Sequence, residues 1–153
     1  MIKEALILAA GKGTRMWPLT ENYPKPLLPL CGKPIIEQQI TALRKVGVSK
    51  INILIGHRMK EISDLVGSGK KYNVEIKYIV QSQQKGTGHA VSLAEEHIEG
   101  AFFCLNGDTL VNEENLSLLS KQKNHMAMMV TPVDDGRKFG AVKTKNGILT
   151  SII

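Results

Sequence analysis

Glycines, basic residues and a hydroxyl lie together near the N-terminus, directly after an apolar run. The run Leu6–Ala10 is followed by Gly11–Arg15 (GKGTR), and a second basic segment, Tyr23–Pro26 (YPKP), comes shortly afterwards. Because glycine has no Cβ, backbone N–H groups in such a loop can approach anionic oxygens closely. Arg15 and Lys25 add positive charge that backbone amides lack. This combination is typical of a loop that binds phosphate groups.

Two common phosphate-binding templates do not fit this loop. The P-loop ends in Gly-Lys-Ser/Thr, whereas Gly13 is followed here by Thr14 and Arg15. The dinucleotide fingerprint needs a small residue where Met16 stands, and an acidic residue after the second strand. That strand ends in Ile55–Arg58 (IGHR), which has no carboxylate. A Gly-x-Gly pair alone is also common in ordinary turns. The surrounding sequence is therefore needed to distinguish a phosphate-binding loop from such a turn.

The longer context is more specific. AAGKGTRMWPLT followed by PKPLLPL resembles the signature of the sugar-phosphate nucleotidyltransferases, of the glucose-1-phosphate thymidylyltransferase or N-acetylglucosamine-1-phosphate uridylyltransferase type. These enzymes join a nucleoside triphosphate to a sugar 1-phosphate and release pyrophosphate. The resemblance implies that Arg15 holds the leaving phosphates and that Lys25 stabilises the α-phosphate or the attacking phosphate. It also implies a set of nucleotide-binding residues in this segment: Leu8, Ala10, Gly11, Gly13 and Thr14.

A second polar segment, Gln81–Ala90 (QSQQKGTGHA), follows another expected strand. A glutamine side chain offers both a donor and an acceptor, so it can pair with the edge of a pyrimidine. The segment resembles the pyrimidine-binding loop of bacterial N-acetylglucosamine-1-phosphate uridylyltransferases. The resemblance implies that Gln81 and Gly86 read the base, with Gln84 and Thr87 close by. Lys85 departs from that pattern and leaves the choice between UTP and dTTP open.

Asp108 follows the apolar run Ala101–Leu105 within an Asn-Gly-Asp tripeptide. Alone, such a tripeptide is more often a turn. The resemblance implies that Asp108 holds Mg²⁺ against the phosphates, and that Gly140 contacts the sugar. In the family, an acidic-basic-proline motif and a second metal-binding acid come further along than Ile153. We therefore expect residues 1–153 to be a nucleotidyltransferase domain that stops before the end of its sugar-binding half.

The elements that must position these residues follow from apolar periodicity. The expected strands are 6–10, 51–55, 74–80, 101–105 and 126–130, with short strands around Gly140 and Gly147. The expected helices are 34–46, 59–66, 89–99 and 113–123. This alternation predicts an α/β fold with a mostly parallel central sheet. The resemblance makes it a Rossmann-like three-layer sandwich of the nucleotide-diphospho-sugar transferase type.

In such sheets ligands bind beyond the carboxyl ends of the strands. The loop at Gly11, Gln81 and Asp108 each come just after an expected apolar strand. We therefore expect them to converge on one edge of the sheet. The order of the strands stays open.

The amino-acid composition indicates which classes of ligand and partner the chain can bind. The chain has 153 residues, and its 20 Lys and Arg against 14 Asp and Glu give a net charge of +6, which suits an anionic ligand. Aromatic residues make up 5%, and no face interleaves them with arginines, so we expect no nucleic acid. No apolar run approaches the length of a membrane span, so we expect no membrane partner. Cys31 and Cys104 are expected to be buried free thiols in a cytoplasmic protein.

The leading hypothesis is nucleotidyl transfer from UTP or dTTP to glucose-1-phosphate or N-acetylglucosamine-1-phosphate. The alternative is a non-catalytic domain of the same fold that binds a nucleotide or sugar nucleotide in a regulatory or assembly role. The presence of Arg15, Lys25 and Asp108 together favours the enzyme. Because the sequence stops inside an expected strand, we also expect an exposed sheet edge and association into a homo-oligomer.

Overall fold

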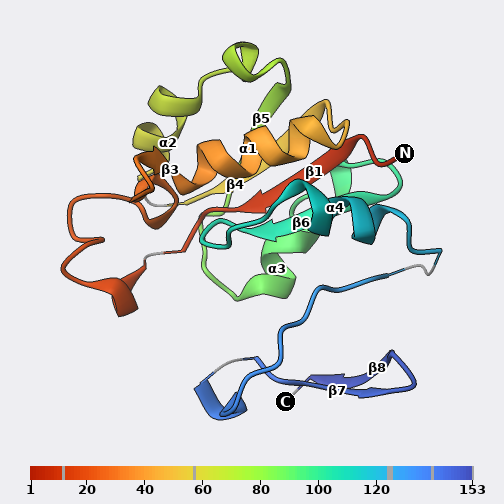
Figure 1. Cartoon of the computed structure of the whole chain (residues 1–153). Coiled ribbons are helices and arrows are strands. Elements are labelled where there is room, and N and C mark those ends of the chain that lie inside the picture. Colours follow the sequence, from red (N-terminus) through yellow and green to blue (C-terminus); the bar gives the residue numbers. More distant parts are fainter. Residues whose placement is uncertain (12, 57, 124–125, 139, 153) are drawn as a thin grey trace. The chain divides into compact units, whose positions relative to one another are not determined.

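The computed structural model describes residues 1–11, 13–56, 58–123, 126–138 and 140–152 (Figure 1). The chain divides into two compact units, Met1–Lys123 and Asn124–Ile153. The first unit contains a parallel sheet with its helices, and the second contains an antiparallel hairpin. Among the described residues, no helix combines the length and the hydrophobicity needed to cross a bilayer.

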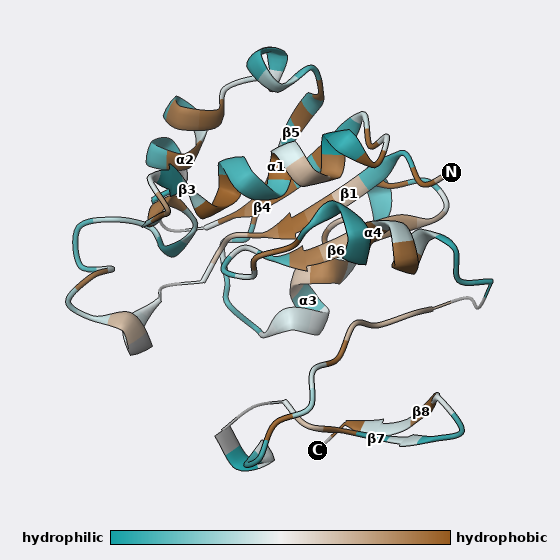
Figure 2. Cartoon of the chain, in the orientation of Figure 1, coloured by the Kyte–Doolittle hydropathy of each residue, from teal (hydrophilic) through white to brown (hydrophobic). Residues whose placement is uncertain are grey.

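A four-stranded parallel sheet forms the centre of the first unit. Its strands are β1 (Glu4–Leu8), β4 (Lys50–Ile55), β5 (Glu75–Val80) and β6 (Phe102–Asn106). They lie in the order β5-β4-β1-β6, and each neighbouring pair is parallel. The two middle strands are almost entirely buried and appear as hydrophobic ribbons in Figure 2. The predicted parallel sheet is therefore confirmed.

Helices cover both faces of this sheet. Helices α1 (Ile35–Lys45), α2 (Met59–Val66) and α4 (Glu113–Ser120) pack on one face, and α3 (Thr87–Ser92) packs on the other. Alternate residues of a strand point to opposite faces. On the first face, Ala5 and Ile7 lie in one core cluster with Ile36, Ile40 and Leu43 of α1. On the second, Leu6 and Leu54 lie in another cluster with Ala90. The predicted three-layer sandwich is confirmed.

Short elements complete the two units. A small hairpin pairs β2 (Pro29–Leu30) with β3 (Lys33–Pro34). Its two central residues, Cys31 and Gly32, have φ of 50° and 78°, as a tight two-residue hairpin turn requires. The 3₁₀ helices are η1 (Thr14–Met16), η2 (Lys25–Leu27), η3 (Lys70–Tyr72), η4 (Glu95–His97) and η5 (Gly136–Lys138). The second unit pairs β7 (Val142–Lys145) with β8 (Ile148–Ile152).

Several expected elements differ from the structure. The strand expected over 6–10 runs over Glu4–Leu8, and the helix expected over 113–123 ends at Ser120. The strand expected over 126–130 is absent, and Met126, Met128, Met129 and Val130 are exposed. Apolar periodicity indicates that a segment could be a strand, but a strand also needs a partner, and the strands β7 and β8 of this unit pair with each other. The helix expected over 89–99 begins earlier and ends at Ser92, and the separate helix η4 follows it.

The expectation of two buried thiols is also wrong. Cys31 occupies the exposed turn of the β2–β3 hairpin, and Cys104 is exposed on β6. Strand β6 lies at the edge of the described sheet, where β1 is its partner. An apolar run therefore does not ensure burial on both faces of a strand.

Candidate functional site

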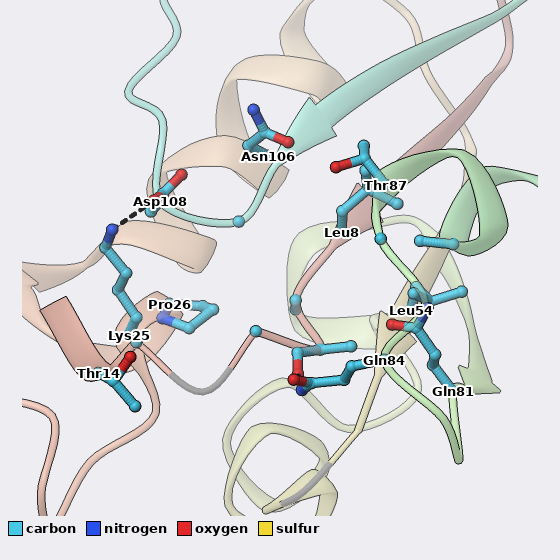
Figure 3. A pocket seen from close by; sticks show the side chains of 17 residues that line it. Leu8, Thr14, Lys25, Pro26, Leu54, Gln81, Gln84, Thr87, Asn106 and Asp108 are labelled. Carbon is cyan, nitrogen blue, oxygen red and sulfur yellow. Dashed lines mark hydrogen bonds and ion pairs between the residues drawn. The ribbon is translucent and has the colours of Figure 1, made fainter. Parts of the chain in front are cut away.

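A pocket of about 540 Å³ lies at the carboxyl ends of the strands of the first unit (Figure 3). It brings together nearly all the site residues predicted from the sequence. Those that line it are Leu8, Ala10, Gly11, Gly13, Thr14, Lys25, Gln81, Gln84, Gly86, Thr87 and Asp108. Convergence of the three predicted segments on one edge of the sheet is confirmed, because they follow the parallel strands β1, β5 and β6 and residues of all three line this pocket.

The glycine-rich loop needs glycine at one position in particular. Gly13 has φ of +68°, and a Cβ added there would lie 3.1 Å from Cγ2 of Thr20. The hydroxyl of Thr20 donates to the carbonyl oxygen of Gly13 at 2.8 Å, which fixes the loop. Arg15 belongs to η1, but its side chain lies outside the described part of the structure. Its predicted role stays a prediction.

One end of the pocket carries its charged side chains. Lys25 begins η2, held between Pro24 and Pro26, and its ammonium pairs with the carboxylate of Asp108 (Figure 3). The two side chains are 23% and 37% exposed, so both can reach a ligand. Gly107 packs so closely that an added Cβ would lie 2.9 Å from the carbonyl oxygen of Leu8. Glycine at this position therefore lets the Asp108 turn approach β1.

The other end of the pocket carries side-chain amides. Gln81 directly follows β5, is 7% exposed, and its Nε2 lies 3.1 Å from Nδ1 of His89. Gln84 donates from Nε2 to the carbonyl oxygen of Ala10 at 2.5 Å. This bond ties the Gln81–Gly86 loop to the start of the glycine-rich loop. Figure 3 shows Gln81 at the opposite end from Lys25 and Asp108, with Gln84 between them.

Two predicted features of the site, the glycine that contacts the sugar and the bound metal, stay predictions. Gly140 is exposed and belongs to the second unit, so its sugar-binding role stays a prediction. Among the described residues, no group of three or more His, Cys, Asp or Glu could enclose a metal ion. Asp108 is the one carboxylate among the described residues that line the pocket.

The structure adds residues that sequence reasoning missed. Further lining residues are Ala9, Pro26, Leu54, Ala90, Asn106 and Gly107. Leu54 could be found only once β4 was known to lie beside β1. Gln39 lies beneath the Asp108 turn with 0% exposure. Its signal was in the sequence, because a polar residue three after Ile36 and four before Leu43 falls on the apolar stripe of α1.

The arrangement suits an elongated ligand that is anionic at one end and carries hydrogen-bonding groups at the other. Lys25 supplies positive charge, and the carboxylate of Asp108 supplies oxygen donors for a cation. Gly11, Gly13 and Thr14 of the glycine-rich loop line the pocket as well. Gln81 and Gln84 place amides where a planar polar group can be read.

Comparison with known proteins gives consistent results. Residues 4–152 match the family model described as nucleotidyl transferase. The bifunctional protein GlmU of Methanococcus vannielii is 39% identical over 140 residues, 92% of this chain and 32% of that protein. Among solved structures, HddC from Yersinia pseudotuberculosis superposes with a TM-score of 0.81 at 26% identity, over 99% of this chain and 69% of that one. A UDP-glucose pyrophosphorylase complexed with UDP-glucose superposes with a TM-score of 0.65 at 28% identity. That superposition covers 79% of this chain and 54% of the pyrophosphorylase chain. The chain spans about a third of the length of the GlmU proteins that it matches.

Proposed function

Because the chain belongs to the nucleotidyl transferase family, we propose that it transfers a nucleotidyl group from UTP or dTTP to a sugar 1-phosphate. The products are a nucleotide sugar and pyrophosphate, which places the chain in nucleotide-sugar biosynthesis. The observation that carries the proposal is the pocket itself, with Lys25 and Asp108 at one end, Gln81 at the other and Gln84 between them. The sugar is glucose-1-phosphate or N-acetylglucosamine-1-phosphate.

The reaction needs no covalent enzyme intermediate. A phosphate oxygen of the sugar 1-phosphate attacks the α-phosphorus, and the bond from that phosphorus to the bridging oxygen of the β-phosphate breaks. The electron pair leaves with pyrophosphate. The protein contributes by holding the two reactants in line and by neutralising charge on the phosphates. Lys25, which lines the pocket, is proposed to serve the second task, and Arg15 is proposed to hold the leaving phosphates.

Nucleotidyl transferases generally use a divalent metal ion, and the residues at the charged end fit Mg²⁺. Mg²⁺ keeps several waters and is bound by one or two carboxylates together with substrate phosphates, so a full protein cage is not needed. Asp108 supplies one carboxylate that is 37% exposed beside the pocket. When bound there, Mg²⁺ would neutralise phosphate charge. Lys25, which pairs with Asp108 in the structure, would then be available to the phosphates.

Base selection is proposed to lie with Gln81. Its buried side chain is held by His89 at 3.1 Å, which fixes the plane of the amide at the wall of the pocket. A fixed amide offers one donor and one acceptor in a defined direction, as a pyrimidine edge requires. The solved relative that holds UDP-glucose supports a pyrimidine nucleotide.

Pyrophosphate release tests this proposal. The chain would be incubated with Mg²⁺, each nucleoside triphosphate, and each of the two sugar 1-phosphates. Release that requires both a sugar 1-phosphate and UTP or dTTP is the expected result. If UTP or dTTP binds and nothing turns over, the alternative of a non-catalytic nucleotide-binding domain is favoured instead.

A further inference from the structure

Gln39 is a polar side chain in the centre of an apolar face. It belongs to α1, has 0% exposure, and lies between Ile36 and Leu43 on the side of the helix that packs against the sheet. Its Nε2 donates to the carbonyl oxygens of Asn106 at 2.8 Å and of Thr109 at 2.6 Å. One amide group therefore joins helix α1 to both ends of a single turn.

That turn carries Asp108. On its strand side the turn is fixed to β1, because the N–H of Gly107 donates to the carbonyl oxygen of Leu8 at 2.9 Å. Within the turn, the N–H of Thr109 donates to the carbonyl oxygen of Asn106 at 3.1 Å. Among the described residues, Gln39 is the one side chain that donates to the backbone of this turn.

The other half of the Gln39 amide has no partner. Its Oε1 is a buried acceptor without a hydrogen bond among the described residues. An unpaired buried acceptor is destabilising, whereas an apolar side chain of similar size would fill the same space without it. Packing alone therefore does not account for glutamine at this position. The two bonds to the turn do.

We infer that Gln39 is a positioning residue that holds the turn Asn106–Thr109 so that Asp108 faces the phosphate end of the pocket. The inference rests on the proposed function, in which Asp108 holds the divalent metal. With the donors of Gln39 removed, the turn keeps its bond to β1 but loses its attachment to α1 at both ends. Asp108 then has more freedom to move, and the carboxylate meets the metal in the required place less often.

The chain offers a matched control next to Gln39 on the same helix. Gln38 also donates from Nε2 to two backbone carbonyl oxygens, those of Leu30 at 2.8 Å and Lys33 at 2.9 Å. These belong to the β2–β3 hairpin, and none of the three residues lines the pocket. Gln38→Met and Gln39→Met therefore remove the same number of side-chain bonds to backbone, but only one of them acts on the Asp108 turn.

The test measures Mn²⁺ binding in the presence of UTP, by electron paramagnetic resonance of the free ion, with the signal lost to UTP alone measured without protein and subtracted. It compares the unchanged chain with Asp108→Asn, Gln39→Met and Gln38→Met. We expect Gln39→Met to weaken Mn²⁺ binding by about tenfold or more, as loss of a supporting residue behind a metal ligand commonly does. Gln38→Met should leave the affinity within about twofold of the unchanged chain, because its bonds lie at the hairpin.

Hydrogen exchange at the amides of Gly107 and Thr109 is a second measurement that needs neither metal nor nucleotide. Faster exchange in Gln39→Met, with the rest of the sheet still protected, is expected. Unchanged Mn²⁺ affinity or unchanged exchange in a folded Gln39→Met would overturn the inference. If Asp108→Asn binds Mn²⁺ as tightly as the unchanged chain, the proposed metal role of Asp108 fails, and the inference fails with it. The Asp108→Asn variant thus distinguishes a failure of the proposed function from a failure of the inference about Gln39 alone.

Discussion

Replacing Lys25 by methionine tests the charged end of the pocket. The substitution keeps most of the length of the side chain and removes its charge. The ion pair with Asp108 is partly exposed, at 23% and 37% for the two side chains, and such pairs contribute about 0–1 kcal/mol to folding. The variant should therefore fold. Any large loss of function would then come from the missing charge at the phosphates.

The size of that loss can be worked out from the setting of the ammonium group. A lysine about 4 Å from a phosphate charge near a protein surface contributes about 4 kcal/mol, which corresponds to roughly a thousandfold in rate. Lys25 is 23% exposed and lines a pocket open to solvent, so some screening applies. We expect Lys25→Met to lower pyrophosphate release by about 10²- to 10³-fold. The preference among bases should be unchanged, because Gln81 lies at the opposite end.

The matched control is Lys45→Met. Lys45 pairs with Glu113 at 2.5 Å, and neither residue lines the pocket. This variant loses the same charge and a similar ion pair, and it should retain nearly full activity. Lys25→Met with turnover within about threefold of the unchanged chain would refute the assignment of Lys25 to the phosphates. If Lys25→Met and Lys45→Met lower pyrophosphate release equally, the loss comes from the change in net charge and not from the position of Lys25 in the pocket.

Three further predictions concern base choice, backbone strain and pH. Gln81→Leu should reduce the ratio of the UTP and CTP affinities by about tenfold, as measured by isothermal titration. An unchanged ratio would show that Gln81 does not select the base. Gly69→Ala should lower the free energy of unfolding, measured in urea, by about 2–4 kcal/mol, because the new Cβ would lie 2.5 Å from a backbone carbonyl oxygen. Gly67 also has positive φ, but a Cβ there would meet no atom within 4 Å, so Gly67→Ala should lower the free energy of unfolding by less. The hydrogen bond from Tyr72 at 2.5 Å holds the pKa of Glu37 below its ordinary value, so this interaction stabilises the fold above that value and is lost as the pH falls through the lowered one. Tyr72→Phe should therefore destabilise the chain by about 1 kcal/mol at pH 7. This difference should shrink as the pH falls below the ordinary pKa of Glu37, and a difference that stays the same throughout the acidic range in which the chain is folded would contradict this cause.

The sequence predicted the site well where a motif follows a strand directly. Gln81 and Asp108 come just after β5 and β6, so the parallel topology alone brings them to the edge that carries the glycine-rich loop. Leu54 was missed because the order of strands is decided by packing between segments, and periodicity along one segment does not record it. The burial of Gln39 could have been found from the apolar stripe of α1, but its partner could not, since Asn106 is 67 positions away in the chain.

The wrong predictions share a physical cause. Periodicity reports which residues prefer to be buried, but it does not say whether a neighbour is present to bury them. The segment 126–130 has the pattern of a strand but pairs with no strand in the described part of its unit, and Cys104 lies on β6, at the edge of the described sheet. In both cases the outcome depends on contacts between segments that are distant in the sequence.

We propose that this pocket binds a pyrimidine nucleoside triphosphate with its phosphates beside Lys25 and Asp108. Isothermal titration of the chain with UTP, dTTP, CTP, ATP and GTP in Mg²⁺ tests it most directly. We predict one site that prefers UTP or dTTP over either purine nucleotide by about tenfold or more, with the binding weakened in Lys25→Met. Equal affinity for purines and pyrimidines, or no binding of any triphosphate, would contradict the claim.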